Sequence, residues 1–210
     1  MGVALLSLFP LPNVVLFPGV PLALHIFEPR YRAMVADALA SDRLIGMVLL
    51  RPGFETDYEG RPPIFPIGCR GVIVHSARLD DGRYNIVLNG LERVSVVDEN
   101  HERAYRRAIV EVLADPPVDA ADQHALRELR GRLETFAGLP ELTDPAAKRL
   151  VEMPDADFVH AMATALDLEP LEKQALLEQS TLLLRAHALV ELLEMRRLAS
   201  HLPDPPGRTH

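Results

Sequence analysis

The chain carries the run LFPLPNVVLFPG at residues 8–19. Its apolar residues favour extended strands, whereas Pro10, Pro12 and Pro18 have no backbone N–H to donate to a β-ladder and therefore mark strand ends. Gly19 permits the turn into the next strand because glycine tolerates positive φ. The run therefore predicts short strands that are separated by a proline-bounded connection.

Short β-branched and apolar runs, separated by Pro, Gly and Asp, continue on both sides of this run to about Leu113. This pattern is typical of a compact β-rich unit. The sequence LDDG at 79–82 predicts a hairpin, because Asp and Gly tolerate the positive φ that such turns require. The predicted strands are Val3–Phe9, Pro21–Ile26, Ile45–Leu50, Ile67–Arg78, Arg83–Val97 and Arg106–Val112.

One helix is expected within this β-rich unit, at Glu28–Ala40. Pro29 suits its first turn, where a missing N–H is no loss. The apolar residues recur at helical spacing, which indicates one buried face. That face comprises Tyr31, Met34, Val35, Ala38 and Leu39.

The pattern changes after the linker-like sequence DPPVD at 115–119, because apolar residues then recur at helical spacing as far as Leu202. We therefore expect a β-rich subdomain at 1–114, a helical subdomain at 115–202 and a frayed tail at 203–210. The expected helices are Ala121–Phe136, two that begin at Pro145 and Asp155, a short one from Pro170, and a long one capped by Ser180. The apolar residues assigned to the long helix are Leu183, Leu184, Ala188, Leu192, Met195 and Leu198.

Charge and composition disfavour several classes of partner. The formal net charge is −8, from 30 acidic and 22 basic residues, which disfavours nucleic acid and anionic membrane surfaces. No apolar run approaches the roughly 18 residues needed to span a bilayer. The single cysteine, Cys69, cannot form an intramolecular disulfide, so a reducing compartment and a cytoplasmic location are expected.

No catalytic constellation stands out in the sequence, and we assign no catalytic, metal-binding or cofactor-binding residues. Cys69 is interpreted as core packing, and Lys148 and Lys173 lack a serine-rich context for a Ser-Lys mechanism. The eight histidines show no ligand spacing, and no P-loop or dinucleotide fingerprint is present. A hydrolase built from the dispersed residues His25, His75 and Asp80 stays open as an alternative.

The stretch His101–Arg107 contains three arginines and Tyr105, a combination that is compatible with an RNA contact. The chain has no second basic patch and a negative net charge. We therefore interpret the stretch as protection of an edge strand against unwanted pairing.

Ordered motifs over about ninety residues resemble the N-terminal substrate-binding domain of Lon proteases. The run at 8–19 is followed by LHIFEPRY at 24–31, then by Gly68 with GVI at 71–73, DGRYNI at 81–86 and GLER at 90–93. The resemblance implies an α+β fold, with a PUA-like, partly closed β-barrel followed by an α-helical bundle. It also implies a stand-alone form without the ATPase and peptidase domains. The structural motif residues are Pro18, Gly19, Glu28, Pro29, Arg30, Tyr31, Gly90 and Arg93.

Two charged motif residues invite a specific hypothesis. Glu28 lies at a helix start and Arg93 in a strand, so a partly buried ion pair between them would link the helix to the hairpin. Arg30 is the competing partner for Glu28.

The resemblance implies a non-enzymatic module that binds exposed apolar or unfolded segments of client polypeptides. We expect a concave apolar surface, placed between the β-rich and helical parts. A separate ATPase and protease are further candidate partners, the oligomeric state is open, and a PUA-like RNA-binding module is an alternative. The expected peptide-contacting residues, in a Pro/Gly-rich loop, are Phe54, Tyr58, Ile64 and Phe65.

Overall fold

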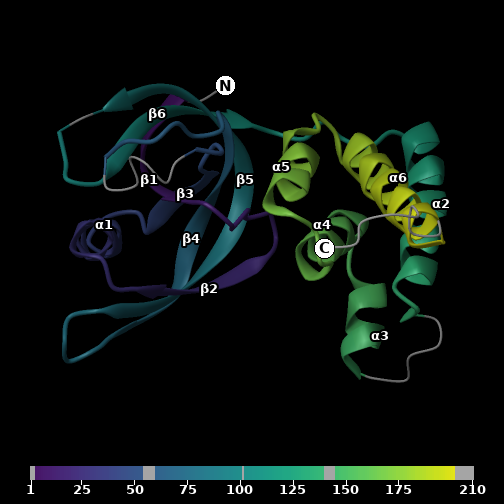
Figure 1. Cartoon of the computed structure of the whole chain (residues 1–210), viewed down its shortest axis with the longest axis horizontal. Coiled ribbons are helices and arrows are strands. Elements are labelled where there is room, and N and C mark those ends of the chain that lie inside the picture. The colour runs from purple at the N-terminus through teal and green to yellow at the C-terminus, as the bar shows by residue number, and fades with distance from the viewer. Residues whose placement is uncertain (1–2, 54–59, 101, 140–144, 202–210) are drawn as a thin grey trace, which may run out of the picture.

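The computed structural model describes residues 3–53, 60–100, 102–139 and 145–201. Figure 1 shows the strands gathered in one part of the molecule and helices α2–α6 in the other, with α1 on the side of the strands that is remote from those helices. Within the described ranges, no helix combines the length and apolar character needed to cross a membrane.

The strands form a sheet that partly closes into a ring. Along the sheet the order is β2-β5-β4-β3-β1-β6, and β6 pairs in addition with β5. Strand β5 is long enough to pair with β2 through its first half and with β6 through its second half. The elements of this part are β1 (Val3–Leu11), β2 (Pro21–Ile26), α1 (Pro29–Leu39), β3 (Leu44–Leu49), β4 (Ile67–Arg78), β5 (Tyr84–Asn100) and β6 (Arg106–Leu113).

The predicted hairpin between β4 and β5 is confirmed. The two strands pair antiparallel from Ile67 opposite Ser95 to Arg78 opposite Tyr84. In the turn, the Gly82 N–H donates to the Leu79 carbonyl over 2.9 Å, and Gly82 has a φ of +80°. A side chain at this position would be strained, which explains why glycine occupies it.

The proline-rich run packs against the middle of β5. Gly19, with a φ of +75°, donates its N–H to the Gly90 carbonyl over 2.9 Å, and the Gly90 N–H returns a bond to the Val20 carbonyl over 3.0 Å. A Cβ on Gly90 would lie 2.0 Å from the Phe17 carbonyl oxygen. Glycine at 90 is therefore required by the close approach of two backbones.

Strand β1 is longer than predicted. The sequence places its end before Pro10, but the strand continues to Leu11, and Pro10 lies opposite Val48 of the parallel neighbour β3. Proline lacks the donor but keeps its carbonyl acceptor, so the ladder continues past it: the Leu50 N–H donates to the Leu11 carbonyl over 3.0 Å.

Strand β6 is not an edge strand, so the interpretation of His101–Arg107 as edge protection is wrong. Strand β6 lies between β1 and β5 and pairs with both. Tyr105 and Arg106 are buried and therefore do not form an exposed RNA-contacting surface. Among the described strands, β2 is the one that pairs along a single side, with β5.

Helix α1 covers one face of the strands with the residues predicted for it. Tyr31, Met34, Val35 and Ala38 are buried, and Leu39 packs partly against the same cluster. This cluster also contains Cys69. The opposite face of β1, β3, β5 and β6 forms a second cluster that includes Leu8, Val94 and Val110.

The helices of the second part are α2 (Ala120–Phe136), α3 (Pro145–Glu152), α4 (Asp155–Ala165), α5 (Pro170–Glu178) and α6 (Leu182–His201). The strand β6 ends at Leu113 and α2 begins at Ala120, and the division into subdomains at residue 115 stays a prediction. The proposed tail at 203–210 lies outside the described residues. The α+β class with a partly closed ring of strands is confirmed.

One detail of α6 differs from the prediction. Its cap is Thr181, whose Oγ1 accepts a hydrogen bond from the Leu184 N–H over 3.1 Å, rather than Ser180. Three of the apolar residues that the sequence places on this helix, Leu184, Met195 and Leu198, are exposed. Apolar residues occur on all sides of this helix, so their periodicity does not identify the buried face. Contacts with other elements decide which side is buried. The buried apolar residues are Leu182, Ala186, Leu189 and Val190.

Candidate functional site

An ionic network with two buried arginines joins the two parts of the molecule. Arg93 on β5 donates from Nη2 to Asp115 Oδ1 over 2.8 Å, and Arg185 on α6 donates from Nη1 to Asp115 Oδ2 over 3.0 Å. Arg185 is fully buried. The proposed pair of Glu28 and Arg93 is therefore wrong, and the competing partner Arg30 binds Glu28 at 2.9 Å.

The electrostatics of the network depress the pKa of Asp115. Burial alone would raise it, but hydrogen bonds and charge from Arg185 and Arg93 outweigh burial, and the pKa lies below its usual value. The carboxylate is therefore held in its charged form between two guanidinium groups.

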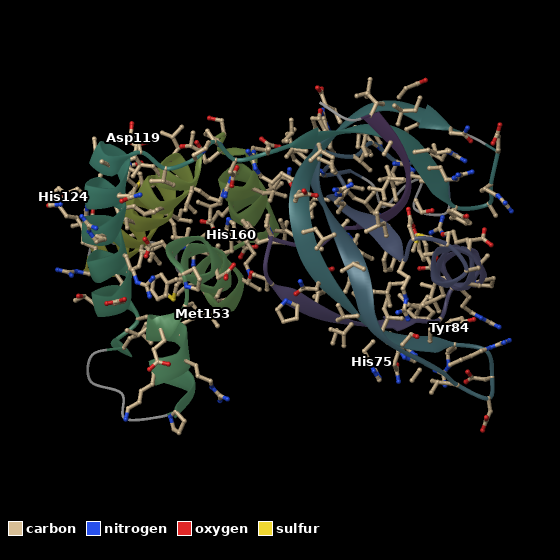
Figure 2. All side chains as sticks on the ribbon, turned by 180° about the vertical axis from the view of Figure 1, so that it is seen from behind. His75, Tyr84, Asp119, His124, Met153 and His160 are labelled. Carbon is tan, nitrogen blue, oxygen red and sulfur yellow. The ribbon has the colours of Figure 1, made fainter. Side chains whose placement is uncertain are left out.

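His160 on α4 extends the network to the proline-rich run. Its Nδ1 lies 2.9 Å from the Pro18 carbonyl oxygen and its Nε2 lies 2.6 Å from Arg185 Nη1. Figure 2 labels His160 on α4, one of the helices that lie beside the strands. Because Arg185 can only donate and a carbonyl can only accept, the ring is neutral with its proton on Nδ1. Burial, reinforced by the nearby Arg185 charge, lowers the pKa of His160 to about 4.

Side chains of both parts pack against one another at the junction, and the concave apolar surface expected there stays a prediction. The Gln174 side chain donates to the Ile67 carbonyl over 2.9 Å, and Phe17 and Leu49 from the β-rich part belong to the same apolar cluster as Phe158 of α4. This region holds the parts together.

A groove of about 380 Å³ lies elsewhere, beside the C-terminal half of α1. Its walls include Leu5 and Ser7 of β1, and Asp37 and Ser41 on or just after α1. Two basic residues, Arg103 and Arg107, come from the chain around the start of β6. We call this the α1–β1 groove, and its polar lining can contact a backbone or charged side chains.

Tyr105 fixes the base of the groove. Its hydroxyl donates to Asp37 Oδ2 over 2.6 Å, and the Arg103 Nη1 lies 3.7 Å from the same oxygen. Burial, with a contribution from Asp37, raises the pKa of Tyr105. The phenol therefore stays protonated and holds α1 against the start of β6.

An exposed apolar patch adjoins this groove. Leu5 on β1 lies directly opposite Ile109 on β6, and the neighbouring pair Leu6 and Ala108 points to the buried face. The patch comprises Val3, Leu5, Val97 and Ile109, which are 67%, 45%, 62% and 38% exposed. Val97 lies at an irregularity in the β5–β6 pairing. Leu5 belongs to both the patch and the groove.

Of the four residues expected to contact peptides, the structure describes Ile64 and Phe65, and these two pack against different apolar clusters. Ile64 is half-buried against the cluster that contains Leu8, and Phe65 packs partly into the helical cluster, with Arg51 over its ring at 5.5 Å. Phe54 and Tyr58 lie outside the described residues.

The dispersed hydrolase alternative finds no support in the geometry. His25 lies 2.7 Å from Asn85 Oδ1 and 3.2 Å from Arg83 Nη1, and within the described part of the chain neither His75 nor Asp80 shares a hydrogen bond with it. Figure 2 labels His75 at the strands, far from His160.

Cys69 is buried, and burial raises the pKa of its thiol to about 12, which disfavours the reactive thiolate. Its neighbour Arg70 does not overcome this effect. Over the described ranges, no group of three or more His, Cys, Asp or Glu residues is arranged to hold a metal ion.

Sequence reasoning missed the central residues of the network, Asp115, His160 and Arg185. Asp115 reads as a linker residue, and His160 and Arg185 occur singly on helices. One signal was present: an arginine and a histidine at otherwise apolar helical positions mark groups that need buried partners. Their partners, however, lie far away in the sequence.

Comparison with known proteins gives consistent matches. The family model described as "ATP-dependent protease La (LON) substrate-binding domain" matches residues 6–195. The chain is 31% identical over 199 residues to Lon protease of Anaeromyxobacter dehalogenans, covering 92% of this chain and 23% of that protein. It is 30% identical over 200 residues to Lon protease 2 of Myxococcus xanthus, covering 91% and 24%. The chain thus spans about a quarter of the length of these relatives.

Two solved structures share the fold. The N-terminal domain of Mycobacterium avium complex Lon protease superposes with a TM-score of 0.66 at 17% identity, covering 95% of this chain and 100% of that one. A Lon N-terminal domain protein from Xanthomonas campestris gives a TM-score of 0.60 at 20% identity, covering 95% and 99%. The likeness covers both the strands and the helices.

Proposed function

The chain belongs to the Lon substrate-binding domain family, and from this premise we propose that it binds segments of other polypeptides that expose apolar side chains, without cleaving them. Family membership is the observation that carries the proposal. RNA binding is less favoured, because Tyr105 and Arg106 of the arginine-rich stretch are buried and the net charge is −8.

We place the binding surface on the apolar patch and the α1–β1 groove. A client segment would cover Val3, Leu5, Val97 and Ile109 with its apolar side chains, since burial of such exposed surface is favourable at about 25 cal/mol per Å². Its backbone and polar groups would reach the groove, where Ser41, Asp37 and Arg107 offer hydrogen-bonding groups. Exposed apolar patches with a polar rim are typical of interaction sites.

The proposal is tested by capture of reduced, alkylated lactalbumin compared with the native, disulfide-bonded form. ATP is left out, and cleavage is monitored in the same tube. We expect selective capture of the unfolded form and no new fragments. Equal affinity for both forms would contradict the proposal, and fragments that persist after repurification would contradict its non-enzymatic part.

The location is tested with a pair of double variants. Leu5→Ser with Ile109→Thr should weaken capture about tenfold, because about 1.4 kcal/mol of apolar contact is removed. Met195→Ser with Leu198→Ser is the matched control, since both residues are exposed and apolar but lie on α6. Equal effects of the two double variants would rule out the patch as the specific surface.

The loop residues stay a separate proposal. Phe54→Ser with Tyr58→Ser, measured in the same assay, tests whether the loop contacts clients. Ile64 and Phe65 are unsuitable for this test because both are packed against apolar clusters, and their replacement would lower stability.

A further inference from the structure

A cavity of about 170 Å³ lies at the end of the strand ring, where β1 and β3 end and β6 begins. Its lining includes Arg30 and Tyr31 at the start of α1, Arg61, and Tyr105 and Arg106. The volume is several times the roughly 30 Å³ that one water molecule occupies in the liquid. The cavity therefore has room for a small ion but not for a folded segment.

Arg106 is the buried cation of this cavity. It is 6% exposed, and its Nη2 donates to the Pro62 carbonyl over 2.7 Å. Its Nε lies 3.7 Å from Glu99 Oε2, beyond hydrogen-bond distance. Within the described residues its Nη1 has no hydrogen-bond partner. A buried guanidinium with an unused donor is costly unless something else accepts from it.

Within the described residues, Arg106 shares its nearby carboxylate with a second arginine. Arg61 also relies on Glu99, at 3.8 Å, so one carboxylate serves two guanidinium groups. Arg30 pairs with Glu28 at 2.9 Å. Burial lowers the pKa of Arg106, with Arg61 and Arg30 adding to the effect of burial and Glu99 opposing it.

We propose that this cavity is a binding site for a small oxyanion, a carboxylate or a phosphate group, held by Arg106 and Arg61. Guanidinium groups bind such anions through paired N–H donors, and the resulting hydrogen bonds are strong because both partners are charged. An oxyanion would accept from the unused Nη1 and add negative charge beside two guanidinium groups that share the Glu99 carboxylate. The site is separate from the apolar patch and does not depend on polypeptide capture.

The test is a titration of the full chain with inorganic phosphate at constant ionic strength, with sodium chloride making up the difference. The arginine side-chain N–H signals are followed by NMR, and the thermal midpoint is recorded in parallel. A site should give saturable shifts of a few arginine signals and a rise in the midpoint, because a ligand that binds the folded state stabilises it. A linear response equal to that of chloride would overturn the proposal.

Arg61→Gln is the informative variant, because Arg61 is partly exposed and its replacement should leave the fold intact. Loss of one charge-assisted contact should weaken phosphate binding about tenfold or more. Arg132→Gln is the matched control, since Arg132 is also a partly exposed arginine paired with a glutamate, Glu194. Unchanged binding in Arg61→Gln, or equal loss in both variants, would overturn the site. The NMR titration of the unmodified chain decides the matter if Arg61→Gln does not fold.

Titrations with other anions identify the chemical source of the bound oxyanion. Saturable binding of acetate, or of a short peptide with a free C-terminal carboxylate but not of its amide, would support a carboxylate ligand. Binding of phosphate without acetate would support free phosphate. The chain itself carries Glu55, Asp57 and Glu59 shortly before Gly60, which lines the cavity. Phosphate binding that requires replacement of these three acids by amides would overturn the proposal for the native chain.

Discussion

His160 is held neutral by its surroundings, although an ordinary histidine would titrate near pH 6.5. Its two ring nitrogens face opposite demands, because the Pro18 carbonyl needs a donor and Arg185 needs an acceptor. Protonation would place a second positive charge 2.6 Å from a buried guanidinium. The neutral ring thus joins α4, α6 and the proline-rich run.

Stability should therefore fall as the pH is lowered from about 6.5 to 4. The unfolded state binds a proton in this window while the folded state does not, so the folded state loses up to roughly 3 kcal/mol relative to neutral pH. Urea unfolding at a series of pH values measures the slope.

The control is His160→Gln, whose amide can donate to Pro18 and accept from Arg185 but does not titrate. Its stability should be nearly flat across the same window until carboxylates such as Asp115 begin to protonate at lower pH. An equally steep slope in His160→Gln would assign the pH dependence to other groups.

Gly90 is a second residue for which the structure predicts a specific effect of substitution on stability. Gly90→Ala should lower the free energy of unfolding by about 2–3 kcal/mol, because the added Cβ would lie 2.0 Å from a backbone oxygen and the proline-rich run would have to move. Gly131→Ala in α2 is the control, because its Cβ meets open space; it should raise stability by about 0.5–1 kcal/mol. Denaturant unfolding compares the two, and similar losses would contradict the close-approach argument.

At the scale of elements, the turn between α5 and α6 shows which of two neighbouring hydroxyl residues contributes to stability through its side chain. The Thr181 hydroxyl accepts from the Leu184 N–H, whereas Ser180 contributes its backbone carbonyl to Arg93. A substitution removes a side chain but leaves a carbonyl in place. The two positions are therefore not equivalent.

Thr181→Ala should lower stability by about 1 kcal/mol through loss of the cap, and Ser180→Ala should change it by less than about 0.5 kcal/mol. Both are measured by thermal or urea unfolding. The reverse order would mean that Ser180 caps α6 after all.

At the scale of the whole molecule, Asp115 is, within the part of the chain that the structure describes, the one carboxylate that accepts from arginines of both parts. It accepts hydrogen bonds from Arg93 of β5 and from Arg185 of α6. Arg93 also donates to the Ser180 carbonyl, and Arg185 donates to the Gln179 carbonyl. The strands and helices also share one apolar cluster through Phe17 and Leu49. We therefore expect the two parts to unfold together.

Asp115→Asn should lower stability by about 3 kcal/mol, because two buried arginines lose the carboxylate that compensates them. Asp98→Asn is the control, because Asp98 is exposed, and it should have little effect on stability.

Two spectroscopic signals report on the two parts separately. All four tyrosines precede residue 106 and the chain has no tryptophan, so tyrosine fluorescence reports on the β-rich part, while far-UV circular dichroism reports mainly on the helices. The two signals should coincide in the native chain and separate in Asp115→Asn. Separate transitions in the native chain would contradict the coupling.

The local sequence determined most of the elements, because hydrophobic period, proline and glycine act over a few residues. The limits of β2 and β4 match the prediction, the helix starts at Pro145, Asp155 and Pro170 match too, and the ordered motifs predicted the family.

The tertiary structure alone decided which charged side chains meet. Asp115 lies 70 residues from Arg185, and Pro18 lies 142 residues from His160. Closure of the strand ring also placed β6 between two neighbours and left the Leu5 and Ile109 side chains exposed together. Pairing over such separations depends on the complete packing of the chain, and no short-range pattern in the residues records it.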